Sequence, residues 1–269
     1  MQRVTCIAEI GINHFGDMQL AKEMIDLSKE SGADIAKFQI YRPEEILGVD
    51  SPYFKEAKKA ELSKEQHTEL KEYCDSKEIE WCASVFHPDL VSFTENLGIK
   101  RYKIASRSVK HLELLQSINE TKKPVIMSVG NCIDSDIIKA INTLRDCNDI
   151  TILYCICNYP TNIRVISLDD MDWLRARYVP SSKRIGPTSG NPGTSSSFAR
   201  ARGVGFSSHC PKIAPSIAAV ARRACTIEHH VVKYKTMKGC DVSSSLTFKE
   251  FGRLVKYIRE IEQIHTFYD

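Results

Sequence analysis

The chain has 269 residues, close to the ~250 of one (β/α)8 barrel, and this length can bury a core without disulfides or structural metal. Its formal charge of +3 at pH 7 argues against nucleic acid or an anionic membrane as a partner. There is no CxxC pair among the 10 cysteines, and no apolar run approaches the roughly 18 residues of a membrane span. With no leader ahead of the first predicted strand, we expect a soluble, cytoplasmic protein with reduced thiols.

Short apolar runs alternate with segments of helical period from one end of the chain to the other. In the first half, strand and helix alternate at 4–10, 18–31, 34–39, 63–76, 80–86, 88–97, 101–105 and a short helix near Lys110. In the second half, they alternate at 124–129, 135–144, 150–157, 168–176, 203–207, 211–223, 225–231 and 247–264. Ser63 and Gln66 form a capping box at the start of the second helix. Eight such units favour an α/β fold, a (β/α)8 TIM barrel, over an open doubly wound sheet.

One segment, 179–202, interrupts this alternation. It is rich in Ser, Gly, Pro and Arg and has almost no apolar period. Loops of this length are uncommon inside a compact domain and are usually disordered or functional. We predict a single barrel domain over 1–269 with a flexible insertion at 179–202. The alternative is a basic lid that carries Lys183 and Arg184 over an anionic substrate.

Polar residues lie where the predicted strands end. In a (β/α)8 barrel the chemistry takes place at the carboxyl ends of the strands, because the loops there converge on one mouth. In chain order, the residues are Glu9, Lys37, Gln39, Ser84, Lys103, Ser106, Ser128, Asn158, Tyr159, Ser207, His209, Glu228, His229 and His230. Lysines and hydroxyls suit phosphate and carboxylate oxygens, and imidazoles suit a divalent transition metal. Any one of these residues alone is more often structural, but together they indicate a site for a phosphorylated ligand and a metal.

The motifs around these residues resemble those of a known family. They are AEIGINHFGD, ADIAKFQ, ELSKEQH, RYKIAS, VIMSVG, CNYPT, VGFSSH, IEHHV and KTMKGCDVSSSL. In this order, and across essentially the whole chain, they resemble the N-acetylneuraminate (sialic acid) synthase family. That family condenses phosphoenolpyruvate with N-acetylmannosamine or a related N-acylated hexosamine, using a divalent metal such as Mn²⁺ or Mg²⁺. The resemblance implies a transferase of carbohydrate biosynthesis that releases a sialic-acid-like nonulosonate and phosphate, and it implies a homodimer.

The resemblance also implies roles for the residues that match. Glu9, His209 and His230 are the expected catalytic residues, with the two histidines as metal ligands and Glu9 near the metal and the reacting water. His229 points to the opposite side of its strand and is not expected to be a ligand. The residues expected to bind phosphoenolpyruvate are Lys37, Ser84, Lys103, Ser106, Ser128 and Ser207. The residues expected to contact the sugar are Gln39, Tyr159 and Asp241.

Some positions depart from the family pattern. Arg107 and Ser108 stand where the family commonly has Gly-Glu, which removes a carboxylate that faces the sugar, and Cys157 replaces a small polar residue. We also expect the family's C-terminal antifreeze-like domain, which supplies an arginine to the partner subunit, to be absent. These changes favour altered acceptor specificity over altered chemistry. Two alternatives stay open: a degenerate, non-catalytic barrel that retains ligand binding, and an aldolase with a Schiff base on Lys37 or Lys103, which needs a lowered lysine pKa.

Overall fold

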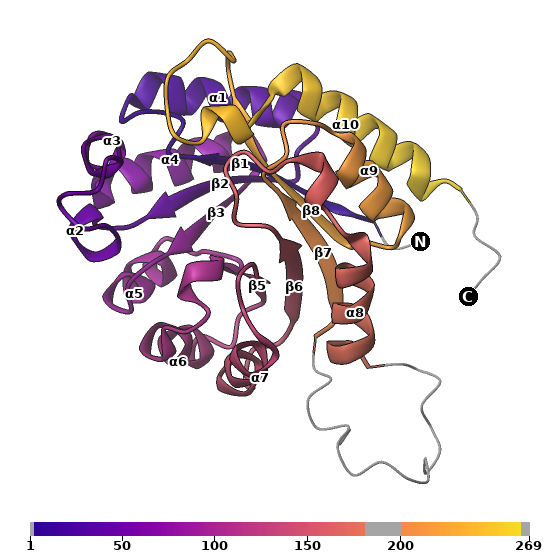
Figure 1. Ribbon diagram of the computed structural model, residues 1–269. Helices are drawn as coiled ribbons and strands as arrows, with labels where there is room; N and C mark the ends of the chain where they lie inside the picture. Colours follow the sequence, from indigo (N-terminus) through magenta and orange to yellow (C-terminus); the bar gives the residue numbers. More distant parts are fainter. Residues whose placement is uncertain (1–2, 181–200, 265–269) are drawn as a thin grey trace, which may run out of the picture.

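Eight parallel strands form a closed barrel in the computed structural model, which describes residues 3–180 and 201–264 (Figure 1). In chain order, the strands are β1 (Thr5–Gly11), β2 (Ile35–Ile40), β3 (Glu80–Val85), β4 (Tyr102–Ile104), β5 (Val125–Ser128), β6 (Ile150–Cys155), β7 (Gly203–Ser208) and β8 (Thr226–Val232). Each strand pairs with the next, and β1 pairs with β8 with residues 5–9 opposite 226–230, which closes the barrel. The predicted (β/α)8 TIM barrel is confirmed.

Helices surround the barrel on the outside (Figure 1). They are α1 (Met18–Glu30), α2 (Pro43–Ile46), α3 (Phe54–Ala60), α4 (Lys64–Ser76), α5 (Asp89–Asn96), α6 (Leu112–Glu120), α7 (Asp134–Thr143), α8 (Leu168–Tyr178), α9 (Ala214–Ala221) and α10 (Phe248–Glu262). The predicted capping box of α4 is present, since Ser63 Oγ accepts from the Gln66 amide and Gln66 Oε1 accepts from the Ser63 amide. A short strand, β9 (Leu246–Thr247), pairs with β8 and leads into α10.

An apolar layer fills the inside of the barrel and sets the depth of the space above it. The layer consists of Ile7, Ile35, Cys82, Ile126 and Leu153, all of them buried. Two residues further along the same strands stand Glu9, Lys37, Ser84, Ser128 and Cys155. Because side chains on a strand alternate between its two faces, these residues point inward as well, one layer closer to the carboxyl end. The strand pleat therefore puts polar groups directly above this apolar layer.

Gly205 on β7 lets this apolar layer pack tightly. A Cβ at this position would lie 2.3 Å from the carbonyl oxygen of Thr226 and 2.6 Å from a methyl carbon of Leu153. Real Cβ atoms do not approach other atoms so closely, so a side chain here would push β7 away from β8 or displace Leu153. The glycine therefore keeps β7 close to β8 at the level of this layer.

The structure differs from the sequence prediction in two places. Helices α2 and α3 were not predicted; they have four and seven residues, which is too short to show a helical period. Strand β6 ends at Cys155, whereas the prediction extended it to Cys157. Residues 181–200 lie outside the described part of the chain, so the flexible insertion at 179–202 and the lid with Lys183 and Arg184 stay predictions.

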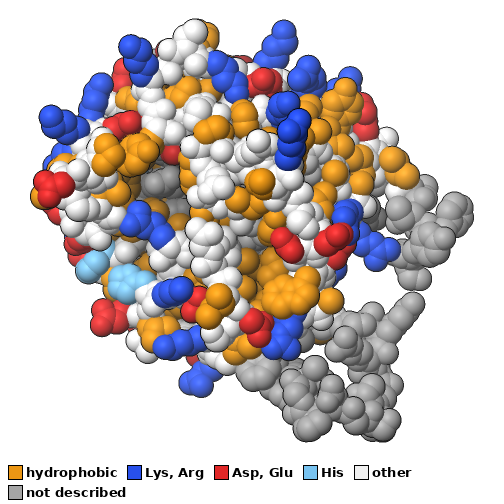
Figure 2. All heavy atoms as spheres, in the orientation of Figure 1, with side chains coloured by type: hydrophobic (Ala, Val, Ile, Leu, Met, Phe, Trp, Pro, Cys, Tyr) orange, Lys and Arg blue, Asp and Glu red, His pale blue; other side chains and the backbone are white. Residues whose placement is uncertain are grey.

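Charged side chains of both signs are interspersed over the face shown in Figure 2, and neither sign gathers into a large patch. This distribution agrees with the near balance of 37 basic and 34 acidic residues in the sequence. None of the helices in the described ranges is long and apolar enough to cross a membrane.

Candidate active site

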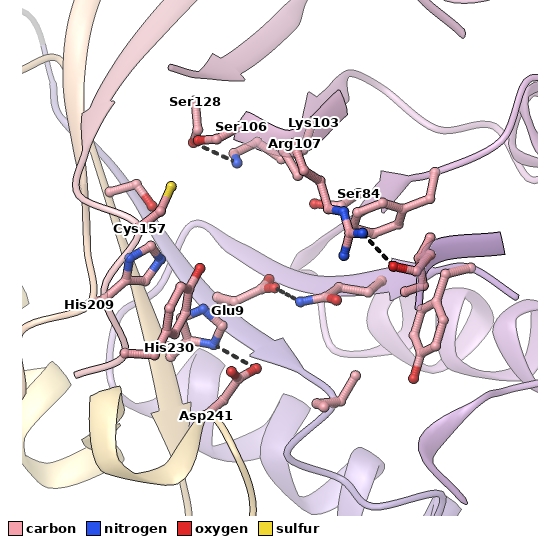
Figure 3. Close-up of a pocket in the computed structure, with 18 of the residues that line it drawn as sticks. Glu9, Ser84, Lys103, Ser106, Arg107, Ser128, Cys157, His209, His230 and Asp241 are labelled. Atoms are coloured by element: carbon pink, nitrogen blue, oxygen red, sulfur yellow. Dashed lines mark hydrogen bonds and ion pairs between the residues drawn. The ribbon is translucent and has the colours of Figure 1, made fainter. Parts of the chain in front are cut away.

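A cavity of about 540 Å³ opens at the carboxyl end of the barrel, within the range typical of small-molecule sites. Its lining includes all twelve residues that the sequence predicted for the site (Figure 3). These are Glu9, Lys37, Gln39, Ser84, Lys103, Ser106, Ser128, Tyr159, Ser207, His209, His230 and Asp241. Barrel closure thus brings together side chains from eight different βα units, as the rule for the carboxyl ends of barrel strands predicts.

Four buried charges form the floor of this cavity: Glu9, Lys37, Lys103 and Glu228, each at most 5% exposed. Lys37 Nζ lies 2.5 Å from Glu9 Oε2 and 3.8 Å from Glu228 Oε2, while Lys103 Nζ lies 3.4 Å from Glu228 Oε1. Burial disfavours each charge by itself, so pairing is what makes them tolerable there. The charges on the floor sum to zero.

Charge pairing determines the ionisation state of Lys37 and Glu228. Burial lowers the pKa of Lys37, but the nearby carboxylates of Glu228 and Glu9 outweigh it and leave the pKa above its usual value. Burial raises the pKa of Glu228, but Lys103 and Lys37 outweigh it and bring the pKa well below its usual value. Lys37 is therefore an ammonium group, and Glu228 a carboxylate, at neutral pH.

Serine hydroxyls surround the two ammonium groups. Lys37 donates to Ser84 Oγ over 3.2 Å. Lys103 donates to Ser128 Oγ over 2.8 Å (Figure 3). Ser207 Oγ donates to Glu228 Oε1 over 3.1 Å. The strand register explains the last of these contacts, because Ser207 pairs with Glu228 across β7 and β8, and it also puts Ser84 opposite Lys103. Hydroxyl and ammonium donors at this spacing can bind the oxygens of a small phosphorylated carboxylate.

Two imidazoles face each other on the opposite side of the cavity, with ring centroids 5.5 Å apart (Figure 3). His209 Nδ1 lies 2.7 Å from the carbonyl oxygen of Ile156, to which it donates when protonated, so that Nε2 is left for a ligand. Burial, followed by the neighbouring His230, lowers the pKa of His209 to about 3, so this ring is neutral at pH 7. His230 Nδ1 is buried, makes no hydrogen bond and lies 3.5 Å from Asp241 Oδ2.

These imidazoles fit a divalent metal that needs further ligands. Metals bind neutral imidazole, and the buried Nδ1 of His230 has no hydrogen-bond partner among the described residues. Within residues 3–180 and 201–264, no group of three or more His, Cys, Asp or Glu side chains is arranged to hold a metal. Water and substrate would therefore complete the coordination shell. His229 points away from the cavity, as predicted, with Nε2 2.8 Å from Ser216 Oγ on α9.

The predicted sugar-contacting residues lie above the floor. Gln39 donates to Glu9 Oε1 over 2.8 Å, which fixes one carboxylate oxygen. The ring of Tyr159 stacks on His209 with centroids 4.0 Å apart, although 49% of the residue is exposed. Asp241 is partly buried beside His230. The sugar-contacting part of the cavity is therefore partly exposed to solvent, whereas the floor is buried.

Sequence reasoning missed an apolar wall on one side of the mouth. The outer wall consists of Tyr41, Ile46, Leu47, Tyr53 and Phe86. It is built largely by the segment that contains α2 and α3, whose helices are too short to predict. The sequence also assigns no role to Glu228, although the alternation of β8 puts it on the same face as His230. Arg107, noted only as a departure, lines the cavity beside Ser106.

Comparison with known proteins relates this site to a family. Residues 24–186 and 194–267 match the model of the NeuB family. The N,N'-diacetyllegionaminic acid synthase of Legionella pneumophila is 31% identical, over 97% of this chain and 73% of that protein. The human N-acetylneuraminate-9-phosphate synthase is 30% identical, over 96% of this chain and 70% of that protein.

A solved structure gives the same result for the fold. The N-acetylneuraminic acid (sialic acid) synthetase of Leptospira borgpetersenii, determined in complex with citrate, matches with a TM-score of 0.87 and 28% identity. The match covers 100% of this chain and 87% of that one. The family model and these relatives together cover nearly the whole barrel. This chain therefore belongs to the NeuB family, and its barrel is a sialic acid synthase-like barrel.

Proposed function

We propose that this chain condenses phosphoenolpyruvate with the open-chain form of an N-acylated amino sugar, giving a nonulosonate and phosphate. The observation that carries the proposal is the cavity floor, where two buried ammonium groups each contact a serine hydroxyl. A phosphate and a carboxylate on one small molecule need two such clusters of donors. The family membership of the chain supports the same reaction class.

In this proposal, Lys37 and Lys103 bind the two anionic groups of phosphoenolpyruvate, with Ser84, Ser128 and Ser207 as further donors. Lysines paired with Glu9 and Glu228 are already held in place, so substrate binding requires little reorganisation. Glu228 lies between the two lysines without occupying all of their donors. The enol carbon is then fixed above the floor, on the side that faces His209 and His230.

The imidazoles of His209 and His230 would hold a divalent metal, Mn²⁺ or Mg²⁺, which when bound supplies Lewis-acid polarisation of the sugar aldehyde. Asp241 orients His230 from 3.5 Å, and the Ile156 carbonyl orients His209. These contacts prepare the two rings as ligands before substrate arrives.

The bond changes assign a proton-transfer role to Glu9. The C3 carbon of phosphoenolpyruvate joins the aldehyde carbon, the aldehyde oxygen gains a proton, and water adds at C2. The bond from C2 to the bridging oxygen then breaks, and phosphate leaves with that oxygen. Glu9, held between Lys37 and Gln39, is the carboxylate placed to take the proton from water.

A Schiff-base aldolase is less compatible with the floor. A nucleophilic lysine needs a lowered pKa, whereas the pKa of Lys37 is raised by Glu228 and Glu9. Lys103 is held by Glu228 and Ser128. A degenerate barrel is also less compatible, because all twelve predicted residues line one cavity.

Phosphate release tests the proposal. Purified protein is incubated with phosphoenolpyruvate and Mn²⁺ against a panel of N-acylated hexosamines, with His209→Ala as the inactive variant and His87→Ala, an exposed histidine outside the cavity, as the matched control. We expect acceptor-dependent release in the wild type and in His87→Ala, and none in His209→Ala. Folded protein that releases no phosphate with any acceptor would contradict the proposal.

Family membership leaves the acceptor open. The names of the relatives differ in their products, one being a diacetyllegionaminic acid and another a 9-phosphate. The chemical group at the end of the acceptor away from the aldehyde must therefore be inferred from the residues of this chain.

A further inference from the structure

Arg107 is the one cation of the described cavity lining without a carboxylate within ion-pair distance. Lys37 and Lys103 are both paired with glutamates. Arg107 donates through Nη2 to the carbonyl oxygen of Ile46, and no other hydrogen bond joins its guanidinium to the described residues (Figure 3). A guanidinium has five N–H donors, so most of them face the cavity or solvent.

The position of Arg107 separates it from the floor. It stands on the 3-10 turn Ser106–Ser108 after β4 and is exposed, whereas the two lysines are 2% and 3% exposed. Its guanidinium reaches across the mouth to the outer wall at Ile46 (Figure 3). In the proposed reaction the sugar aldehyde must reach the enol carbon above the floor. The remote end of the same sugar then points to the mouth, where Arg107 lies.

We infer that the acceptor is an anionic amino sugar, with a phosphate ester or a carboxylate at its remote end that Arg107 binds. This inference rests on the proposed function and specifies its substrate class. A planar guanidinium binds phosphate or carboxylate oxygens in a bidentate manner. In the proposed reaction the two ammonium groups of the floor are already occupied by phosphoenolpyruvate, which leaves Arg107 as the cation for a second anionic group.

Binding measurements test this inference separately from turnover. By isothermal titration without phosphoenolpyruvate, we compare N-acetylmannosamine, its 6-phosphate and N-acetylmannosaminuronic acid on the wild type, Arg107→Met and Arg107→Lys. The matched control is Arg42→Met, an arginine near the outer wall that does not line the cavity and pairs with Glu45 and Asp89. The neutral sugar serves as the reference, so each variant is judged by its ratio of dissociation constants.

We expect the wild type to bind at least one anionic sugar at least about 10-fold more tightly than the neutral sugar, the range of a charge-assisted hydrogen bond. Arg107→Met should abolish this preference, Arg107→Lys should keep part of it, and Arg42→Met should keep it all. Comparison of the 6-phosphate with the uronic acid shows whether Arg107 binds a phosphate ester or a carboxylate.

Three binding results would overturn the inference. The first is equal affinity of the wild type for all three sugars, and the second is no measurable binding of either anionic sugar. The third is a loss of affinity in Arg107→Met that is equal for neutral and anionic sugars, as a purely structural arginine would give. Phosphate release with the neutral sugar alone would overturn it too, while leaving the proposed function intact. Tight, Arg107-dependent binding without any phosphate release would uphold the inference and contradict the proposed function.

Discussion

The floor and the mouth of the cavity are built in opposite ways. The floor residues Lys37, Lys103, Glu9 and Glu228 come from strands, are almost completely buried and balance one another's charge. The mouth is formed by turns and short helices, is partly exposed, and contains Arg107 without a carboxylate partner. Strands hold side chains rigidly, whereas loops vary more easily. Under the proposed function, the rigid floor sets the reaction class and the more variable mouth sets the choice of acceptor.

The largest expected effect comes from removing one floor cation. Lys103→Met should lower kcat/KM for phosphoenolpyruvate by about 100- to 1,000-fold, the cost of losing one well-placed electrostatic donor. Steady-state phosphate release measures this loss, with Lys110→Met, an exposed lysine outside the cavity, as the matched control. A loss of less than about threefold would show that the floor does not bind the substrate and would remove the distinction from the mouth.

Glu228→Gln is expected to weaken the fold itself. The substitution leaves two buried ammonium groups with one carboxylate instead of two, and breaking a buried pair costs on the order of 3 kcal/mol. Urea unfolding measures the change in the free energy of unfolding. Glu44→Gln, in an exposed ion pair with Lys58, is the control and should change stability little. Equal effects of the two substitutions would contradict a charge-balanced floor.

Acid should destabilise the barrel through a histidine away from both regions. Burial, followed by the influence of His14, lowers the pKa of His67 to about 3, against 6.5 for an ordinary histidine. Below pH 6.5, His67 binds a proton in the unfolded chain but not in the folded chain. The stability that depends on a neutral His67 is therefore fully present above pH 6.5 and is lost as the pH falls toward 3. At pH 5 the loss from this residue is about 2 kcal/mol relative to pH 7.

His67→Gln isolates that contribution. Its free energy of unfolding should fall by about 2 kcal/mol less than that of the wild type between pH 7 and pH 5. Urea unfolding at the two pH values gives the comparison. Parallel losses in both proteins would contradict this prediction, because they would mean that His67 binds a proton in the folded barrel as readily as in the unfolded chain.

The smallest effect is expected where the mouth meets the proposed metal site. Asp241→Asn removes the charge that orients His230 from 3.5 Å, and the concentration of Mn²⁺ for half-maximal activity should rise about 10-fold. A Mn²⁺ titration of phosphate release measures it. An unchanged midpoint, with a raised KM for the sugar, would assign Asp241 to the acceptor alone.

The floor is more predictable from the sequence than the mouth, for physical reasons. Barrel closure converts a list of strand ends into one ring of neighbours, so the sequence alone places Lys37, Ser84 and Lys103 together. The alternation of β8 also separates His229 from His230 correctly. Neither rule applies to loops. The outer wall depends on helices of four and seven residues, and the contact of Arg107 with Ile46 joins positions 61 residues apart.

Glu228 shows a different limit of sequence reasoning. Its place on the inner face of β8 follows from the alternation that identifies His230. Its function as a shared partner of two lysines does not, because that depends on side chains from β2 and β4 meeting across the barrel. Strand alternation and register predict the face of the strand from which a side chain projects. Charge pairing across the barrel depends instead on the three-dimensional positions of the side chains.

The position of the bridging oxygen of phosphoenolpyruvate after the reaction gives the sharpest test of a synthase. The wild-type protein is given phosphoenolpyruvate with ¹⁸O at the bridging position, together with Mn²⁺ and the sugar that the acceptor panel identifies. We expect acceptor-dependent release of phosphate that carries the label, because the C2–O bond breaks. Label that stays in the organic product would show hydrolysis at phosphorus, and release that is independent of the sugar would show that no condensation takes place; either result would contradict a synthase.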